Sequence, residues 1–153
     1  MTRELTTPFL AADVIIELID HPGRPIVLID RRNPPYGLAI PGGFVDRGAE
    51  SVEQAAVREA MEETSLPVRL IALLGIYSHP ERDSRMHTAT AIYVGEAHGS
   101  PMAADDARAV RVVALEEIAG LADSLAFDHR MVLEDYRVFR ATGGVAPLRG
   151  IQA

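Results

Sequence analysis

The chain of 153 residues contains no cysteine and no lysine, so all fifteen of its basic residues are arginine. Without cysteine there can be no disulfide framework and no thiolate metal site. We attribute the absence of lysine to a compositional bias of the source genome, although arginine suits phosphate recognition. The formal net charge of -7 argues against general nucleic-acid binding, which needs a basic surface.

The sequence also lacks an apolar run long enough to span a membrane. Near its start it lacks the apolar core that is typical of a signal peptide. We therefore expect a cytoplasmic protein that binds neither nucleic acid nor membranes. Because 48% of the residues are hydrophobic, the chain can build one core, and we expect a single domain over residues 1–153.

Apolar and β-branched stretches predict strands at 9–20, 25–30, 38–40, 68–77, 88–96 and 110–114. Helical patterns cover 51–66, 115–121 and 129–141. The two kinds of element are mixed without strict alternation, which favours an α/β fold with a mixed β-sheet between helices. The tail from about Thr142 contains glycine and proline, and we expect it to be loose.

The segment from Gly42 to Leu66 is the most informative part of the chain. It begins as a glycine-rich turn and continues as a predicted helix without internal glycine or proline. Ser51 followed by Gln54 forms the pattern of a capping box at the helix start. Pro67 ends the helical pattern, because proline cannot continue a helix.

Three glutamates stand at positions i, i+3 and i+4 of this predicted helix: Glu59, Glu62 and Glu63. At this spacing the three carboxylates share one face, where like charges repel. A hard divalent cation such as Mg²⁺ removes that repulsion and takes carboxylates together with substrate phosphates as ligands. The alternative for the three glutamates alone is a solvated acidic helix face.

The surroundings of the three glutamates favour the metal site. Arg58 precedes them, and Glu50 lies eight residues before Arg58. The whole segment 43–66 resembles the Nudix box, G-x5-E-x7-R-E-U-x-E-E-x-G-U, in which U is aliphatic. The residues that match the box are Gly43, Glu50, Arg58, Glu59, Glu62, Glu63 and Leu66. From Glu50 onward the spacing between them is that of the box.

The segment departs from the box at three positions. Six residues instead of five separate Gly43 from Glu50, as though Ala49 were inserted in the turn. Ala60 fills an aliphatic position with a very small side chain. Ser65 replaces the glycine with which the helix of the box usually ends in a left-handed conformation, so we expect strain there.

The resemblance implies an α/β/α sandwich and an enzyme that uses water to split a diphosphate linked to another group. It implies that Glu59, Glu62 and Glu63 bind Mg²⁺, or Mn²⁺ in its place, with Glu50 as a further metal ligand. Arg58 joins the catalytic set, and we expect it to pair with Glu50 and orient the carboxylates. By analogy with family members we also expect a homodimer.

The general base is left open among a glutamate of the helix and four loop acids, Glu81, Asp83, Asp105 and Asp106. For the substrate cleft we expect Gly43, Arg32, Phe44 and Arg82, with Tyr36 and Arg85 as further candidates. Aromatic faces can stack on a base, and arginine can hold phosphate. The alternatives are core packing for Phe44 and a solvated loop for Arg82 and Arg85. We interpret Asp128 and His129 as a helix cap.

Several stretches outside the box are similar to the small ADP-ribose pyrophosphatases: 31–35, 77–83 and 126–129. This similarity implies a small nucleotide substrate, ADP-ribose, with AMP and ribose 5-phosphate as products. One alternative is a nucleoside triphosphate pyrophosphohydrolase that removes oxidised nucleotides. Another is a non-catalytic module that senses a nucleotide, but such modules typically lose the box glutamates that this chain keeps.

Overall fold

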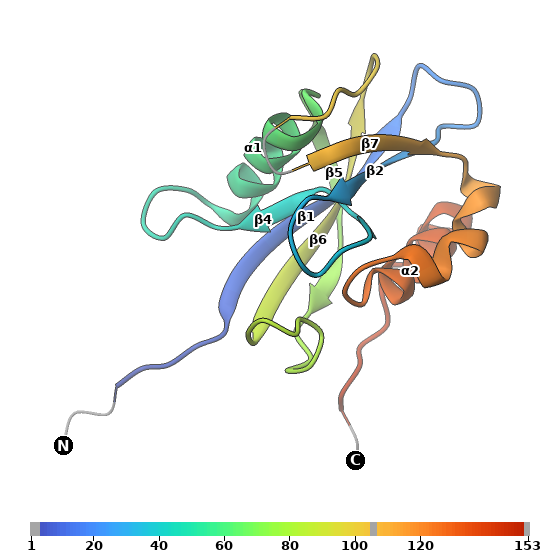
Figure 1. Ribbon diagram of the computed structural model, residues 1–153. Coiled ribbons are helices and arrows are strands. Elements are labelled where there is room, and N and C mark those ends of the chain that lie inside the picture. Colours follow the sequence, from blue (N-terminus) through green and yellow to red (C-terminus); the bar gives the residue numbers. More distant parts are fainter. Residues whose placement is uncertain (1–3, 105–106, 152–153) are drawn as a thin grey trace.

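A mixed sheet of seven strands with helices on both faces forms the framework of the protein (Figure 1). The computed structural model describes residues 4–104 and 107–151. Its elements are β1 (Phe9–Leu18), β2 (Ile26–Arg31), β3 (Leu38–Ala39), β4 (Gly42–Phe44), α1 (Val52–Thr64), β5 (Arg69–Tyr77), β6 (Thr88–Ala97), β7 (Ala107–Val113), the 3-10 helix η1 (Leu115–Ser124) and α2 (His129–Thr142). The predicted mixed sheet between helices is confirmed.

Strand β1 lies at the centre of the sheet and is shared by three neighbours. One of its edges pairs in parallel with β6 from Phe9 to Leu18. Its other edge is divided, because β4 pairs with residues 11–13 and β2 pairs with Ile16 and Glu17, both antiparallel. Strands β2 and β4 therefore diverge along β1 just after Asp13, and this divergence opens the sheet on one side.

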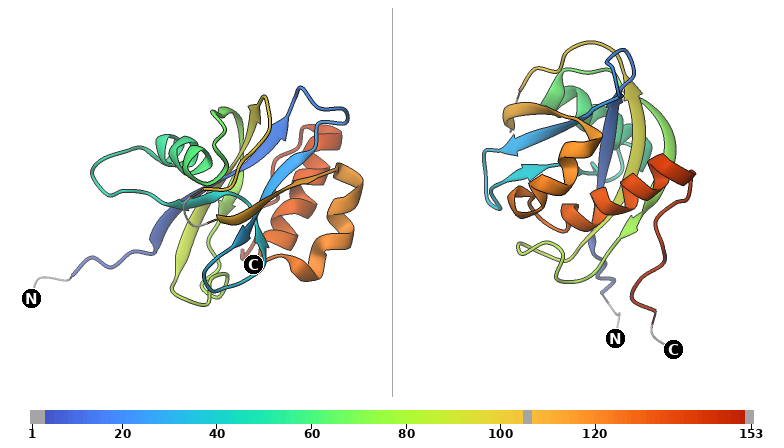
Figure 2. Two further views of the ribbon diagram at one scale, coloured as in Figure 1. Left: turned by 45° about the horizontal axis from the view of Figure 1, so that its top comes forward. Right: turned by 90° about the vertical axis from the view of Figure 1, so that its right-hand side faces the viewer.

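The two faces of the sheet carry separate hydrophobic cores. Helices α1 and α2 lie on opposite sides of the sheet (Figure 2). Alternate residues of β1 point to opposite faces, as the period of a strand requires. Val14 and Ile16 pack toward α1, whereas Ile15 belongs to the core beneath η1 and α2. Helix α1 presents small residues to the sheet, and Ala56 and Ala60 are fully buried. The small side chain at position 60 thus lets the helix lie close to the strands.

Helix α1 begins and ends where local signals place it. The Ser51 side chain accepts a hydrogen bond from the Gln54 backbone N–H, and the Gln54 side-chain oxygen accepts one from the Ser51 N–H. At the other end Ser65 is left-handed with φ of 61°, and its N–H donates to the Met61 carbonyl. Both the capping box and the strained Ser65 were expected from the sequence, and both are confirmed.

Three features differ from the expectation. The glycine-rich segment is a short strand, because Gly42 and Gly43 pair with β1. The element predicted as a helix over 115–121 is a 3-10 helix and is longer. The tail after Thr142 is held to the body, since the Ala146 N–H donates to the Leu74 carbonyl at 2.8 Å. Among the described residues no helix combines the length and apolar character required to cross a membrane.

Candidate active site

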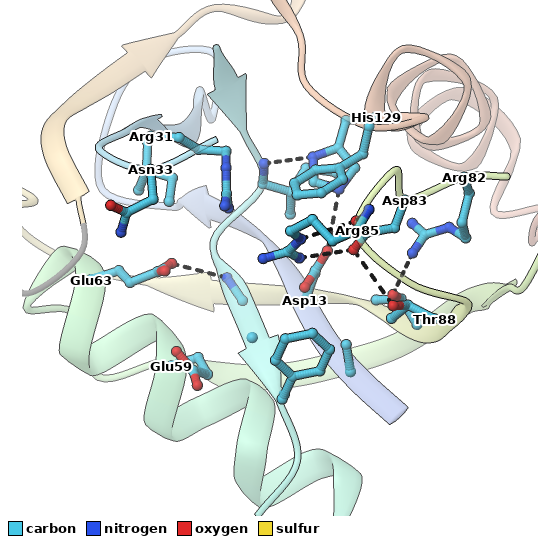
Figure 3. A pocket seen from close by; sticks show the side chains of 18 of the residues that line it. Asp13, Arg31, Asn33, Glu59, Glu63, Arg82, Asp83, Arg85, Thr88 and His129 are labelled. Carbon is cyan, nitrogen blue, oxygen red and sulfur yellow. Dashed lines mark hydrogen bonds and ion pairs between the residues drawn. The ribbon is translucent and has the colours of Figure 1, made fainter. Parts of the chain in front are cut away.

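A cleft of about 340 Å³ opens where β2 and β4 diverge from β1 (Figure 3). The sheet, the box helix, the β5–β6 loop and the start of α2 all contribute side chains to it. The polar lining residues are Asp13, Arg31, Arg32, Asn33, Asp46, Glu59, Glu63, Arg82, Asp83, Arg85, Thr88, Thr90 and His129. Acidic groups from α1 face one side of this cleft, and arginines face the other.

The acidic wall consists of Glu59 and Glu63, which α1 presents one turn apart. Burial raises the pKa of Glu63 to about 8, although a hydrogen bond of 3.0 Å from the Gly42 N–H to its Oε2 opposes the shift. Burial also raises the pKa of Glu59, against the effect of its bond to Arg58. Both carboxylates are thus partly removed from water without enough positive charge to compensate, an arrangement that a bound cation would relieve.

The two glycines of β4 provide the space in which this wall is built. A Cβ atom at Gly43 would approach all three carboxyl atoms of Glu59, with 2.5 Å to Oε1. A Cβ atom at Gly42 would lie 2.5 Å from the Ala12 carbonyl oxygen and 2.5 Å from the Asp13 Cα. Any side chain at these positions would therefore push the strand from β1 or displace the Glu59 carboxylate.

Arg58 ties the box together, as expected from the sequence. Its Nε and Nη2 donate to the two oxygens of Glu50 at 2.9 and 2.6 Å, and its Nη1 donates to Glu59 and Glu62 at 2.9 and 3.1 Å. A further bond reaches the Phe44 carbonyl at 3.2 Å. These bonds lower the pKa of Glu50 to about 2, with the Arg58 guanidinium as the main cause. Arg58 therefore orients the carboxylates and has no nitrogen left for substrate.

Glu62 occupies a different position from its two neighbours. It is absent from the lining of the cleft, and 42% of its side chain is exposed beside Arg58. Among the residues that the structure describes, no three histidine or acidic side chains form a ready metal-binding group. Glu59 and Glu63 are thus the two box carboxylates that face the cleft directly, and Arg58 links Glu59 to Glu62 and Glu50.

The basic wall consists of Arg31 and Arg85, which meet at the ring of Phe127. The guanidinium carbons lie 4.8 Å and 5.4 Å from the centre of that ring. Arg31 Nε donates to the Pro35 carbonyl at 2.7 Å, while Arg85 donates through Nε and Nη2 to Asp83. Within the described residues, both Nη atoms of Arg31 and Nη1 of Arg85 make no hydrogen bond, so they can receive an anion.

Asp13 and His129 form a buried pair at the floor of the cleft. The Ile40 N–H donates to His129 Nδ1 at 3.0 Å, so that nitrogen must be unprotonated. The proton of the neutral ring is then on Nε2, which lies 3.3 Å from Asp13 Oδ2. This arrangement fixes the Asp13 carboxylate between the acidic wall and Arg85 (Figure 3). The sequence interpretation of His129 as part of a helix cap missed this role.

Arg82 belongs to the framework of the cleft, although we expected it to bind substrate. It is 8% exposed, and its Nε and Nη2 form two bonds to Asp128 at 2.9 and 2.7 Å. Its Nη1 donates to Thr90 at 2.6 Å, so all three nitrogens are used. Asp128 stands at the cap position of α2 but makes no side-chain cap bond. Arg82 and Asp128 instead fasten the β5–β6 loop to the start of α2.

Two other expected substrate contacts, Arg32 and Phe44, line the cleft together with Gly43. Phe44 also contacts Arg85, whose guanidinium carbon lies 5.5 Å from the ring centre. Tyr36 is 70% exposed and is not part of the lining. The solvated-loop alternative for Arg85 is wrong, because its guanidinium is held between Asp83 and aromatic rings.

The candidates for the general base are now separated by their surroundings. Asp83 is buried, which favours a higher pKa, but hydrogen bonds from the Arg85 side chain and backbone outweigh burial and lower the pKa. Asp83 is therefore a poor proton acceptor. Glu81 is exposed and is absent from the lining of the cleft. Asp105 and Asp106 lie outside the described residues. Of the helix glutamates, Glu59 and Glu63 face the cleft, and the choice of base between them stays open.

Sequence reasoning missed several residues of this cleft, among them Asp13, Arg31 and Phe127. Asp13 is one of two acids, with Glu17, inside an otherwise apolar strand, and a buried acid of this kind is a signal for a polar function. Phe127 has a left-handed backbone with φ of 55°, which no sequence pattern around it indicates. These residues are far apart in the sequence. The pairing of β1 with β2 and the packing of α2 against the sheet bring them together.

Comparison with known proteins identifies the family of the chain. The model of the NUDIX domain matches residues 8–136, and the chain belongs to the Nudix family. It is 40% identical over 132 residues to a Methanocaldococcus jannaschii protein named ADP-ribose pyrophosphatase. The aligned region covers 84% of this chain and 73% of the relative. It is 35% identical to a Bacillus subtilis protein named putative 8-oxo-dGTP diphosphatase, over 58% of this chain and 55% of the relative.

Solved structures show the same fold. The NUDIX domain of Shewanella oneidensis NrtR, solved in complex with ADP ribose, superposes with a TM-score of 0.78 at 24% identity. The match covers 90% of this chain and 91% of that chain. The arrangement of mixed sheet and flanking helices is therefore that of the Nudix fold.

Proposed function

We propose that the protein hydrolyses a nucleoside diphosphate linked to another group, with ADP-ribose as its substrate. One observation carries the proposal: a single cleft sets the carboxylates of Glu59 and Glu63 opposite the open guanidinium nitrogens of Arg31 and Arg85. Carboxylates suit a divalent cation, and guanidinium groups suit phosphate oxygens. A diphosphate bound with a metal ion would satisfy both walls at once.

The residues present fit a bound Mg²⁺ or Mn²⁺. Glu59 and Glu63 would hold the ion in the cleft, and Glu62 and Glu50 are further ligand candidates on either side of Arg58. When bound, the metal neutralises phosphate charge and lowers the pKa of a coordinated water. Arg58 keeps Glu50, Glu59 and Glu62 in place, and the two open arginines bind phosphate oxygens.

The choice of ADP-ribose rests on the relatives and on charge. The relative at 40% identity is named ADP-ribose pyrophosphatase. A nucleoside triphosphate brings more negative charge into a cleft that already holds Asp13, Glu59 and Glu63. A diphosphate with a second sugar brings less charge and adds hydroxyl groups. The name of the Bacillus subtilis relative makes an oxidised triphosphate the second candidate.

A substrate panel tests the proposal. The purified protein is given ADP-ribose, common nucleoside triphosphates and 8-oxo-dGTP with Mg²⁺, and AMP and phosphate products are measured. We expect the highest kcat/KM for ADP-ribose. A clear preference for a triphosphate would reject ADP-ribose but keep the hydrolase, whereas nucleotide binding without hydrolysis of any compound would indicate a sensor.

Variants of the box glutamates identify the groups that act. Glu59→Gln, Glu62→Gln and Glu63→Gln should each lower kcat by on the order of 10²-fold or more while the fold is kept. Glu53→Gln is a matched control, because Glu53 is an exposed glutamate of α1 outside the cleft. Near-full metal-dependent turnover by Glu63→Gln would show that the metal assignment is wrong. The preference for Mg²⁺, the homodimer and the cytoplasmic location stay predictions.

A further inference from the structure

Phe127 adopts a backbone conformation that is costly for its side chain. Its φ of 55° lies in the left-handed region, which glycine and, less often, asparagine tolerate. The neighbouring backbone holds it there, since the Ala126 N–H donates to the Leu38 carbonyl at 2.8 Å and the His129 N–H donates to the Ala126 carbonyl at 3.2 Å. Glycine would remove the strain, so the phenyl ring itself must compensate for it.

The ring of Phe127 lies within reach of two positive charges. The guanidinium carbons of Arg31 and Arg85 are 4.8 Å and 5.4 Å from its centre, both within the range of a cation–π interaction. Two arginines gathered at one ring repel each other. Burial lowers the pKa of Arg31, and the charge on Arg85 lowers it further. The pair therefore needs a group that holds the two cations close without neutralising them.

An acidic side chain between the two arginines would hold them but would also compete with an incoming phosphate. A phenyl ring attracts both cations through its negative face and donates nothing to their nitrogens. Each arginine is also held by a hydrogen-bond acceptor away from the ring, Arg31 by the Pro35 carbonyl and Arg85 by Asp83. Figure 3 shows the two arginines on the side of the cleft opposite Glu59 and Glu63.

We propose that Phe127 is a positioning residue that holds the guanidinium groups of Arg31 and Arg85 together at one wall of the cleft, with their free nitrogens available to the phosphates of the substrate. This inference rests on the proposed function, because it takes the arginine pair as the receptor for the diphosphate. It assigns Phe127 a role that does not involve contact with the base of the nucleotide.

Inorganic pyrophosphate with Mg²⁺ is the decisive probe, since it has phosphates but no base and no sugar. Its Kd is measured by calorimetry for the wild type, Phe127→Leu and Phe127→Tyr. Loss of the ring in Phe127→Leu should raise the Kd roughly tenfold, the size expected for weakening two cation–π contacts. For ADP-ribose, KM should rise by a similar factor with little change in kcat. Phe127→Tyr should restore both values.

Replacement of Phe127 by phenylalanine analogues with one or three ring fluorines keeps the size of the ring while weakening its negative face. The Kd for pyrophosphate should rise with each step of fluorination. Because these analogues keep the ring, the test does not depend on whether Phe127→Leu folds. A Kd that stays constant across the fluorinated series would overturn the inference. So would a wild type that does not bind pyrophosphate.

A double-mutant cycle with Arg85→Leu separates positioning from packing. If Phe127 acts through Arg85, the effects of the two single changes on pyrophosphate binding should not add in the double variant. Additive effects would contradict the inference, as would weaker binding of AMP by Phe127→Leu with unchanged binding of pyrophosphate. Failure of the wild type to hydrolyse ADP-ribose would reject the proposed function, while the pyrophosphate series would still decide the role of Phe127.

Discussion

Gly43 and Glu59 are in contact so close that a single added carbon would separate them. A Cβ atom built on Gly43 would lie 2.5 Å from Oε1 and 2.6 Å from Cδ of Glu59. The glycine of the box is thus needed for the space that it leaves, because its φ is not left-handed. That space is occupied by a carboxylate that we propose as a metal ligand.

Gly43→Ala should therefore leave the protein folded and lower its activity. The Glu59 side chain can swing away from the new methyl group, but it then leaves its position beside Arg58. We expect a loss of roughly 10- to 100-fold in metal affinity or kcat, the usual effect of disturbing the support of a metal ligand. Circular dichroism and a metal titration of activity measure both quantities.

Gly42→Ala is a contrasting variant, because its new methyl group would meet not only the Asp13 carboxylate but also backbone atoms of β1 that cannot move aside. It should destabilise the fold by about 1–3 kcal/mol, as overpacking does. Equal losses of stability in the two variants would show that Gly43 also serves the fold and that its contact with Glu59 is incidental.

The buried carboxyl of Glu63 predicts a pH dependence of stability in the absence of metal. Its pKa in the folded protein is about 8, above the ordinary value of about 4.3 in the unfolded chain. The folded state thus holds this proton more tightly, and the resulting stability is complete below the unfolded pKa and lost as pH rises through the folded value. Glu63→Gln removes this titration but keeps an acceptor for the Gly42 N–H.

Thermal melts in EDTA between about pH 4 and pH 9 test this prediction. Relative to the wild type, Glu63→Gln should gain stability as the pH rises, and Glu53→Gln should show no such trend. Added Mg²⁺ should then stabilise the wild type more than Glu63→Gln. Parallel stability curves for Glu63→Gln and the wild type would mean that the carboxyl titrates normally.

Ser65 offers a site where stability can be increased without touching the cleft. Its φ of 61° is strained for serine, and its hydroxyl makes one long contact within the described residues, of 3.3 Å to the Met102 carbonyl. Ser65→Gly should stabilise the protein by roughly 0.5–1 kcal/mol, which is visible as a higher melting temperature. Ser65→Ala, which keeps the strain and removes the hydroxyl, should give no gain. A lower melting temperature for Ser65→Gly would show that the hydroxyl contact matters more than the strain.

The sequence predicted those parts of the molecule that local interactions determine. The start of α1 follows from Ser51 and Gln54, which are three residues apart, and its end follows from Ser65 and Pro67. The pairing of Arg58 with Glu50 was expected because eight residues of a turn and helix bring them together. Strand positions followed from apolar runs, which do not depend on the partner strand.

The parts that could not be predicted depend on contacts between distant segments. The hydrogen bond from Ile40 to His129 joins residues 89 positions apart, and it determines which ring nitrogen faces Asp13. Arg82 looked like a loop cation, yet Asp128, 46 positions away, uses two of its nitrogens. The parallel pairing of β1 with β6 has no local signal either. The arginine and histidine side of the cleft therefore depends on the tertiary fold, whereas the box helix is determined by its local sequence.

The final prediction concerns the extra residue in the turn before α1. Residues 46–49 are exposed, Gly48 is left-handed with φ of 77°, and the Ala49 N–H closes the turn on the Asp46 carbonyl at 3.1 Å. Glu50 lies after this turn and keeps its spacing to Arg58. Because the added length is confined to an exposed turn, removal of Ala49 should preserve the fold and most of the activity. Melting temperature and kcat/KM for ADP-ribose measure the two effects, with Ala49→Gly as a control that keeps the length. A folded but inactive deletion variant would instead show that the longer turn, through Asp46 at the edge of the cleft, positions metal or substrate.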